Sequence, residues 1–143
     1  TAIEAEIAKR TGTYTGEKLY HIGVGVDAYA LAVPGIPIVL SPKSALVFTV
    51  NVWDDTAGVK VNPKPQQFTL IEAFTDKSVV GSGLTQTREE QIQGLAAQAG
   101  RRIQLWLVQN KAWFTPEAVA ARAAAKGATP ATGAANAAPA PAN

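Results

Sequence analysis

The stretch "ALVFTVNVWDD", residues 45–55, decides the fold class because it carries the strongest β-strand signal of the chain. It is rich in β-branched and aromatic side chains, which suit the pleated and half-buried surface of a sheet. Residues 56–58, "TAG", then predict a turn. The next such run, "QQFTLIEAFTD" at 66–76, predicts a second strand. Together the two strands predict a hairpin with a protruding loop at 55–65.

Two acidic residues, Asp54 and Asp55, stand where the first of these strands ends. Consecutive strand residues point to opposite faces, so these carboxylates do not converge as a catalytic pair would. Aspartate at a strand end before a Thr-Ala-Gly sequence is ordinary turn chemistry. We therefore interpret the pair as turn residues.

Upstream of this hairpin, residues 19–33 alternate in polarity with a period of two, which predicts a long strand. The even-numbered positions, Tyr20 to Ala32, fall on one face, and a bend is expected at Gly23 and Gly25. Residues 23–28 also fit the loose dinucleotide-loop pattern G-x-G-x-x-A. Because the alternation continues past Gly25 with no helix start, we interpret the glycines as strand residues and predict no dinucleotide site.

Two further segments carry extended-chain signals. Residues 33–44, "VPGIPIVLSPKS", contain three prolines and predict an irregular stretch with an edge strand at 36–40. Ile36 and Ile38 in it are candidate partner-binding residues, and the alternative is a loop packed over the core. Residues 78–86, "SVVGSGLTQ", predict a third consecutive antiparallel strand.

The helical signals lie at the beginning and in the last third of the chain. Residues 1–11 predict a short amphipathic helix that ends at Gly12. Thr87 and Glu90 form a capping-box pattern that starts a helix over 87–110. Its apolar stripe predicts packing across one face of the sheet, and it consists of Ile92, Leu95, Ala96, Ala99, Ile103, Trp106 and Leu107. The fold class is therefore α+β, with a mainly antiparallel sheet of about four strands, one long helix on a face and the short N-terminal helix at the sheet's edge.

The C-terminal part divides into a helix and a tail. Thr115 as N-cap and Pro116 at the first helical position start an alanine-rich helix, which Gly127 stops. Residues 127–143 hold no charge and no large apolar side chain, which is typical of a flexible tail. The expected organisation is a globular domain at 1–112, a helix at 113–126 and a low-complexity tail at 127–143.

Residues at the start of the C-terminal segment are candidates for docking to another protein. Trp113, Phe114 and Val119 provide large apolar side chains beside Lys111, a combination that suits a protein interface or peripheral membrane contact. The alternative is an apolar plug that closes the end of the core. The docking hypothesis predicts that the core folds without residues 112–143.

Composition and charge exclude several function classes. The net charge is +2 and the basic residues are not clustered, which argues against nucleic-acid binding. There is no cysteine, so disulfides and thiolate chemistry are excluded. No apolar run reaches the roughly 20 residues that span a bilayer.

Chemical motifs are scarce. His21 is the only histidine, so sites with several histidine ligands cannot form, and no P-loop or Ser-elbow motif occurs. We predict no catalytic, cofactor-binding or metal-ligating residues, no cofactor, and a protein that is not an enzyme. An alternative is a small-ligand-binding module or minor enzyme that uses His21 and Asp27 on one strand face.

The order of strand, hairpin, strand and capped helix resembles small bacterial cell-envelope domains, notably outer-membrane lipoproteins of secretion and surface-assembly systems. The residues that carry the resemblance are the start "TAIEAEIAKR", the block "ALVFTVNVWDD", the junction "VVGSGLTQTREEQ" and the Ala/Pro tail. Such lipoproteins carry an acylated cysteine at the mature start, which this sequence does not contain. The resemblance implies a periplasmic or outer-membrane-associated structural or adaptor subunit that acts through protein contacts or self-association. A phage or virion structural protein is the remaining alternative.

Overall fold

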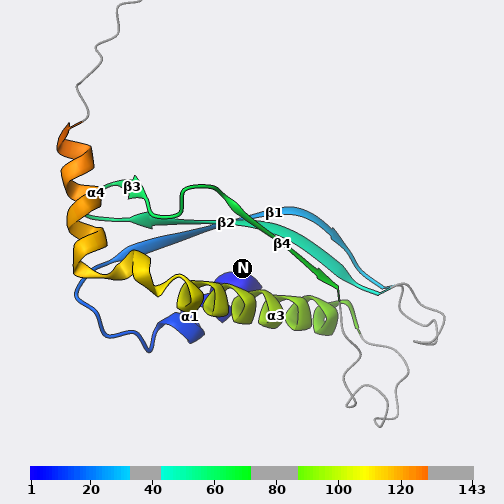
Figure 1. Ribbon diagram of the computed structural model, residues 1–143. Coiled ribbons are helices and arrows are strands. Elements are labelled where there is room, and N and C mark those ends of the chain that lie inside the picture. Colours follow the sequence, from blue (N-terminus) through cyan, green and yellow to red (C-terminus); the bar gives the residue numbers. More distant parts are fainter. Residues whose placement is uncertain (33–42, 72–86, 129–143) are drawn as a thin grey trace, which may run out of the picture.

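The fold is α+β, as predicted, and the residues that the structure describes form an antiparallel sheet of four strands and three α-helices (Figure 1). The computed structural model describes residues 1–32, 43–71 and 87–128. The expected edge strand at 36–40, the expected strand at 78–86 and the tail after residue 128 lie outside these residues. The strands are β1 (Tyr20–Ala30), β2 (Ala45–Asp54), β3 (Val59–Lys60) and β4 (Gln66–Ile71).

Strand β2 is the centre of the sheet. It pairs antiparallel with β1 on one side and with β3 and β4 on the other. The pairing of β2 with β4 confirms the predicted hairpin, with Phe48 directly opposite Phe68. Alternate side chains of β2 are buried in the hydrophobic core. They are Leu46, Phe48, Val50 and Val52.

The segment expected to be a protruding loop at 55–65 is more ordered than predicted. It begins with a turn in which Asp54 Oδ1 accepts a hydrogen bond from the Ala57 amide at 3.0 Å. Gly58 closes the turn at φ +63°, a conformation that side chains with a Cβ rarely adopt. Then β3 returns along β2, and the buried Asn62 accepts the Val52 amide proton at 2.8 Å. The Asp54–Ala57 bond confirms the turn interpretation of Asp54. The prediction of a protruding loop is wrong, because β3 pairs with β2 and the Asn62 side chain continues the hydrogen bonding to β2 between β3 and β4.

Strand β1 departs from the prediction in one respect. Its irregularity lies between Val26 and Ala28, not at the glycines, and one extra residue there shifts the register from Val26–Phe48 to Ala28–Val47. The bulge moves Ala28 and Ala30 away from the face that holds Tyr20, Ile22 and Val24. The predicted single face of even-numbered residues is therefore wrong beyond Val26.

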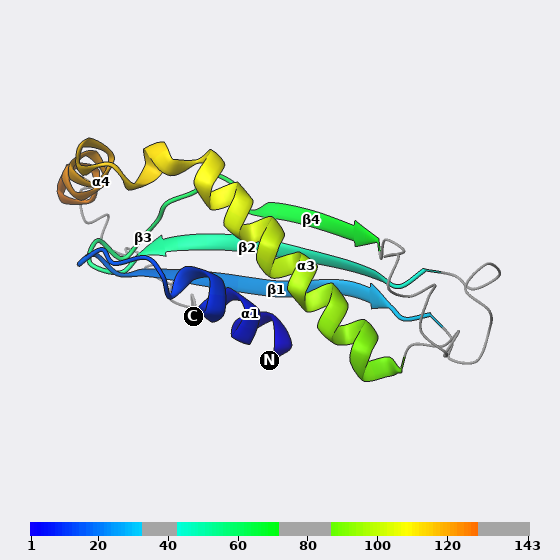
Figure 2. The same cartoon turned by 90° about the horizontal axis from the view of Figure 1, so that it is seen from below.

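Helix α3 (Arg88–Gln109) crosses one face of the sheet and closes the core (Figure 2). Thr87 and Glu90 form the predicted capping box. Six of the seven residues of the predicted stripe are buried, and Ile92 is 38% exposed. Gln91 is buried instead, although its polarity suggested a solvent position, because its side chain bonds to Ser44 and to the Ala32 carbonyl.

Helix α1 (Ala2–Thr11) lies beside α3 on the same side of the sheet, along the outer border of β1 (Figure 2). It ends where predicted, since the Gly12 amide bonds to the Ala8 carbonyl at 2.8 Å. Gly100 of α3 is the contact point, because a Cβ there would stand 3.0 Å from Glu6 Cβ. The small residue lets the two helices approach closely.

After α3, a 3-10 helix η1 (Lys111–Phe114) and helix α4 (Pro116–Ala128) turn across one end of the sheet (Figure 1). Thr115 Oγ1 accepts the Ala118 amide proton at 3.4 Å, in accord with its predicted capping role. The helix continues one residue past Gly127, where an end was expected. Arg122 of α4 reaches the buried Asp54 at 3.6 Å and also donates to the Trp113 carbonyl at 2.7 Å. This contact joins α4 to the β2–β3 turn.

Candidate functional site

The feature that offers a site is the outer edge of β1. Within the described parts of the chain, β1 pairs with β2 alone, so its other side has no partner strand. The strand is 11 residues long and contains no proline or lysine, the residues that commonly protect such edges. An edge of this kind presents unpaired backbone groups to which another extended segment can bind.

The hydrogen-bond pattern identifies which backbone groups point outward. The Leu19 carbonyl accepts from the Asp55 amide at 3.3 Å, so odd-numbered residues at this end of β1 face β2. On the far side of β2, the Val52 carbonyl accepts from the Val61 amide at 2.8 Å, which fixes the same alternation. In an antiparallel ladder the intervening residues direct both N–H and C=O away from the partner. The outward-facing residues of β1 are therefore Tyr20, Ile22, Val24 and Val26.

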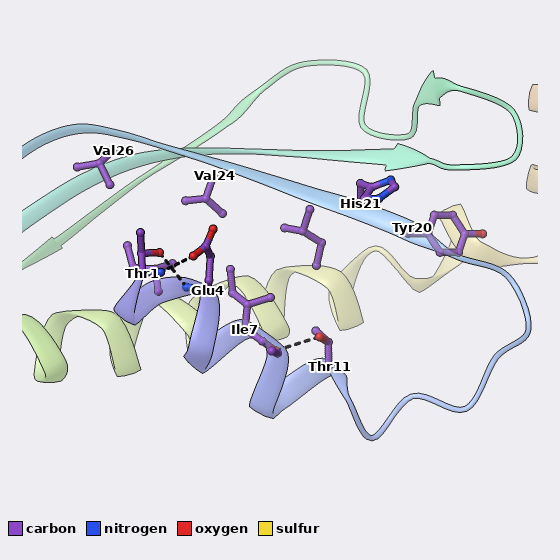
Figure 3. A pocket seen from close by; sticks show the side chains of 11 residues that line it. Thr1, Glu4, Ile7, Thr11, Tyr20, His21, Val24 and Val26 are labelled. Atoms are coloured by element: carbon purple, nitrogen blue, oxygen red, sulfur yellow. Dashed lines mark hydrogen bonds and ion pairs between the residues drawn. The ribbon is translucent and has the colours of Figure 1, made fainter.

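A groove runs beneath this edge, between β1 and α1 (Figure 3). Its volume is about 400 Å³, and Val24 of β1 faces Ile7 and Glu4 of α1 across it. The lining is mainly apolar and consists of Thr1, Ile3, Glu4, Ile7, Ala8, Thr11, Tyr20, His21, Ile22, Val24 and Val26. Side chains of an added strand that point to the helical side of the sheet would enter this space.

Two carboxylates lie near β1 on opposite faces of the sheet: Asp27 on the face away from α1, and Glu4 on α1 at the groove. Asp27 follows Val26 and accepts hydrogen bonds from Thr49 Oγ1 at 2.6 Å and Gln67 Nε2 at 3.0 Å. These two bonds lower the pKa of the Asp27 carboxyl, so it is ionised at neutral pH. Glu4 is 76% exposed and forms an ion pair with the Thr1 amino group, which lowers its pKa. Among the described residues that line the groove there is no lysine or arginine, and its cation is the Thr1 amino group, which is already paired with Glu4.

On the opposite face of the sheet, no described residue covers the two glycines of β1. A Cβ built on Gly25 would have nothing within 4 Å, and one on Gly23 would meet only the Asn51 carbonyl oxygen at 3.9 Å. Packing inside the described chain therefore does not require glycine at these positions. Glycine in a strand often marks a place where another chain comes close.

The predicted docking residues have contacts within the chain. Trp113 packs edge-to-face on Trp106 with ring centroids 5.4 Å apart, and Phe114 packs on Tyr20 at 5.0 Å. Both rings are half-buried at the end of the core, as is the Val119 side chain on α4. Ile36 and Ile38 lie outside the described residues. The partner-binding role of these five residues stays a prediction.

The two residues of the alternative hypothesis have separate neighbours. His21 Nδ1 lies 3.1 Å from Asp55 Oδ1 at the β2–β3 turn. Asp27 instead belongs to the hydrogen-bonded row with Thr49 and Gln67. The structure thus joins each side chain to a different polar group.

Sequence reasoning found β1 and α1 but missed the groove between them. The two-residue periodicity of a strand places Ile22 and Val24 on one face, but it does not reveal which edge of the strand lacks a neighbouring strand. One available signal was overlooked. Thr1 and Glu4 repeat the Thr-x-x-Glu capping box seen at Thr87, and the structure forms it.

Comparisons with known proteins add little beyond this geometry. No protein-family model matches the chain, and a search of curated proteins finds no match. Among solved structures, the chain is similar to the crystal structure of a "putative lipoprotein" from Caulobacter crescentus CB15. The two are 18% identical, the match covers 80% of this chain and 84% of that one, and the TM-score is 0.47. A TM-score at this level carries no argument about function.

The helices of the described segments were also compared with the requirements of a membrane span. Across residues 1–32, 43–71 and 87–128, none is both long enough and apolar enough to cross a bilayer.

Proposed function

We propose that this protein is a non-catalytic adaptor or structural subunit that binds an extended segment of a partner protein along β1. The observation that supports the proposal is the β1 edge, which has no partner strand among the described residues, above the apolar groove of about 400 Å³. Backbone groups of β1 would provide affinity, and the groove would take alternate side chains of the bound segment.

The location of the groove supports a bound strand over a second helix. The outward groups at Tyr20, Ile22, Val24 and Val26 are spaced for an extended backbone. A helix has no free backbone groups along its length and would leave these donors and acceptors without partners. An added strand continues the sheet and satisfies them.

The first experiment uses a phage-displayed library of random octapeptides with the folded chain as bait. Selected peptides should perturb the amide resonances of the four outward-facing residues of β1. Replacement of Val24 by proline should abolish binding and leave the fold intact, because the lost N–H points outward and edge strands accept proline there. Val24→Thr, which keeps the N–H, is the matched control and should still bind.

Three outcomes would contradict the proposal. One is a selection with no binder above background. A second is a set of binders that perturb another surface, and the third is equal binding by Val24→Pro. Hydrogen exchange of the free chain adds an independent check, since outward amides that are already protected would mean that the chain itself covers this edge.

We also propose that the assembly belongs to the bacterial cell envelope, in a periplasmic or outer-membrane-associated location. This part rests on the resemblance of the element order and the quoted sequence blocks to envelope lipoproteins. Fractionation of native cells with an antibody to the chain tests it. Recovery in the envelope fraction is expected, and recovery in the cytosol alone would refute the location and leave the binding proposal standing.

A further inference from the structure

We infer that the segment bound by β1 has a defined composition: apolar side chains toward α1 and an aromatic side chain over the glycines. This inference rests on the proposed function. It goes further because it specifies the chemistry of the partner from the two faces of the site.

The apolar requirement follows from the groove. Side chains directly opposite Ile22 and Val24 of β1 share their face and therefore point toward α1. There they meet Ile3 and Ile7, which are partly buried against the core. A polar side chain placed there would lose water without gaining a partner. Valine, isoleucine or leucine is therefore expected at every second position.

The aromatic requirement follows from the bare face. Gly23 and Gly25 direct their backbone groups toward β2, so a residue opposite either of them forms a pair without hydrogen bonds on the outer edge. In such pairs the Cα atoms approach to about 4.5 Å, closer than in hydrogen-bonded pairs. An aromatic ring opposite can lie across the space that has no atom within 4 Å of a Cβ at Gly25. Aromatic side chains that cover strand glycines in this way stabilise sheet edges.

The experiment uses synthetic seven-residue peptides whose groove-facing positions are valine. One peptide has tryptophan opposite Gly25, and a second replaces the tryptophan by alanine. Isothermal titration with the full chain should show a loss of up to about fivefold in affinity for the alanine peptide, since a cross-strand aromatic pair contributes up to about 1 kcal/mol.

One variant of the chain shows whether the loss arises at the stated residue. Gly25→Val fills the bare space with a side chain that this chain accommodates, so it should remove the preference for tryptophan and leave the alanine peptide unaffected.

The outcomes separate the two proposals. Peptides that bind at β1 with equal affinity, whatever stands opposite Gly25, would overturn this inference and leave the proposed function standing. Peptides that do not bind at β1 at all would overturn both. A tryptophan preference that survives in Gly25→Val would show that the ring binds elsewhere and would also refute the inference.

Discussion

Replacement of Asp54 by asparagine removes the charge that holds three parts of the chain together. The Asp54 carboxylate is fully buried at the end of β2. Lys18, from the loop before β1, donates to it at 2.8 Å, and the Arg122 guanidinium of α4 lies 3.6 Å away. Asparagine retains an oxygen for the Ala57 amide but leaves the two cations without a counter-charge.

The expected cost is about 3 kcal/mol in the free energy of unfolding. Removal of one member of a buried ion pair costs about 3–5 kcal/mol, because the remaining charge is left desolvated. The lower end applies here because the Lys18 side chain is 28% exposed and can recover part of its hydration. For a chain of this length the melting temperature should fall by about 10 °C.

The pH dependence gives a second readout with a definite sign. Burial alone would raise the pKa of Asp54, but the hydrogen bonds from Lys18 and the Ala57 amide and the charges of Lys18 and Arg122 lower it below its usual value. A carboxyl with a lowered pKa in the folded state stabilises the protein at higher pH. That contribution decreases as the pH falls below about 4, through the unfolded and then the folded pKa. The difference between wild type and Asp54→Asn should therefore shrink in acid.

Thermal and urea denaturation at pH 7 and across the acid range measure both effects. Asp55→Asn is the matched control, since this neighbouring carboxylate is 44% exposed and its contact with His21 lies at the surface. We expect the control to change stability by less than about 0.5 kcal/mol. An Asp54→Asn variant within about 1 kcal/mol of wild type at pH 7 would refute the reasoning.

Two further substitutions test packing and backbone pairing. Phe114→Ala removes the ring that packs edge-to-face on Tyr20 and should cost about 2 kcal/mol in urea denaturation, with a larger loss when the chain is truncated after Lys111; unchanged stability of the truncated chain would favour the docking interpretation of this segment. Asn62→Ala deprives the buried Val52 amide of its acceptor and should cost about 1–3 kcal/mol, with faster hydrogen exchange at that amide. Exchange at Val52 as slow as in the wild type would show that another group accepts its proton.

Local signals in the sequence predicted the elements well. The alternation of β2 and the capping box at Thr87 define their elements without reference to the remaining chain, and the structure confirms both. The bulge after Val26 was not predictable, because one extra residue in a strand leaves the alternation of nearby polar and apolar residues almost unchanged. Burial of Gln91 was missed for a related reason, since its partners Ser44 and Ala32 are far away in the sequence.

The candidate site depends on relations between elements, which a single sequence hardly encodes. Strand order determines which edge of β1 lacks a partner strand among the described residues. The position of α1 beside α3 determines the groove. Gly100 makes that contact possible, yet in the sequence it appears only as a weak point in a helix. Arg122 likewise stands in an alanine-rich helix and gives no sign that its partner is Asp54.

The bulge in β1 limits how long a bound segment can remain in register with the strand. Up to Val26 the even-numbered residues face outward, but beyond the bulge Ala28 and Ala30 pair with Val47 and Ala45, so Tyr29 becomes the outward-facing residue. A regular strand alternates without interruption and cannot match both phases. The edge that a regular strand can pair with therefore extends from Tyr20 to Val26, about 20 Å. This length matches a partner segment of about seven residues.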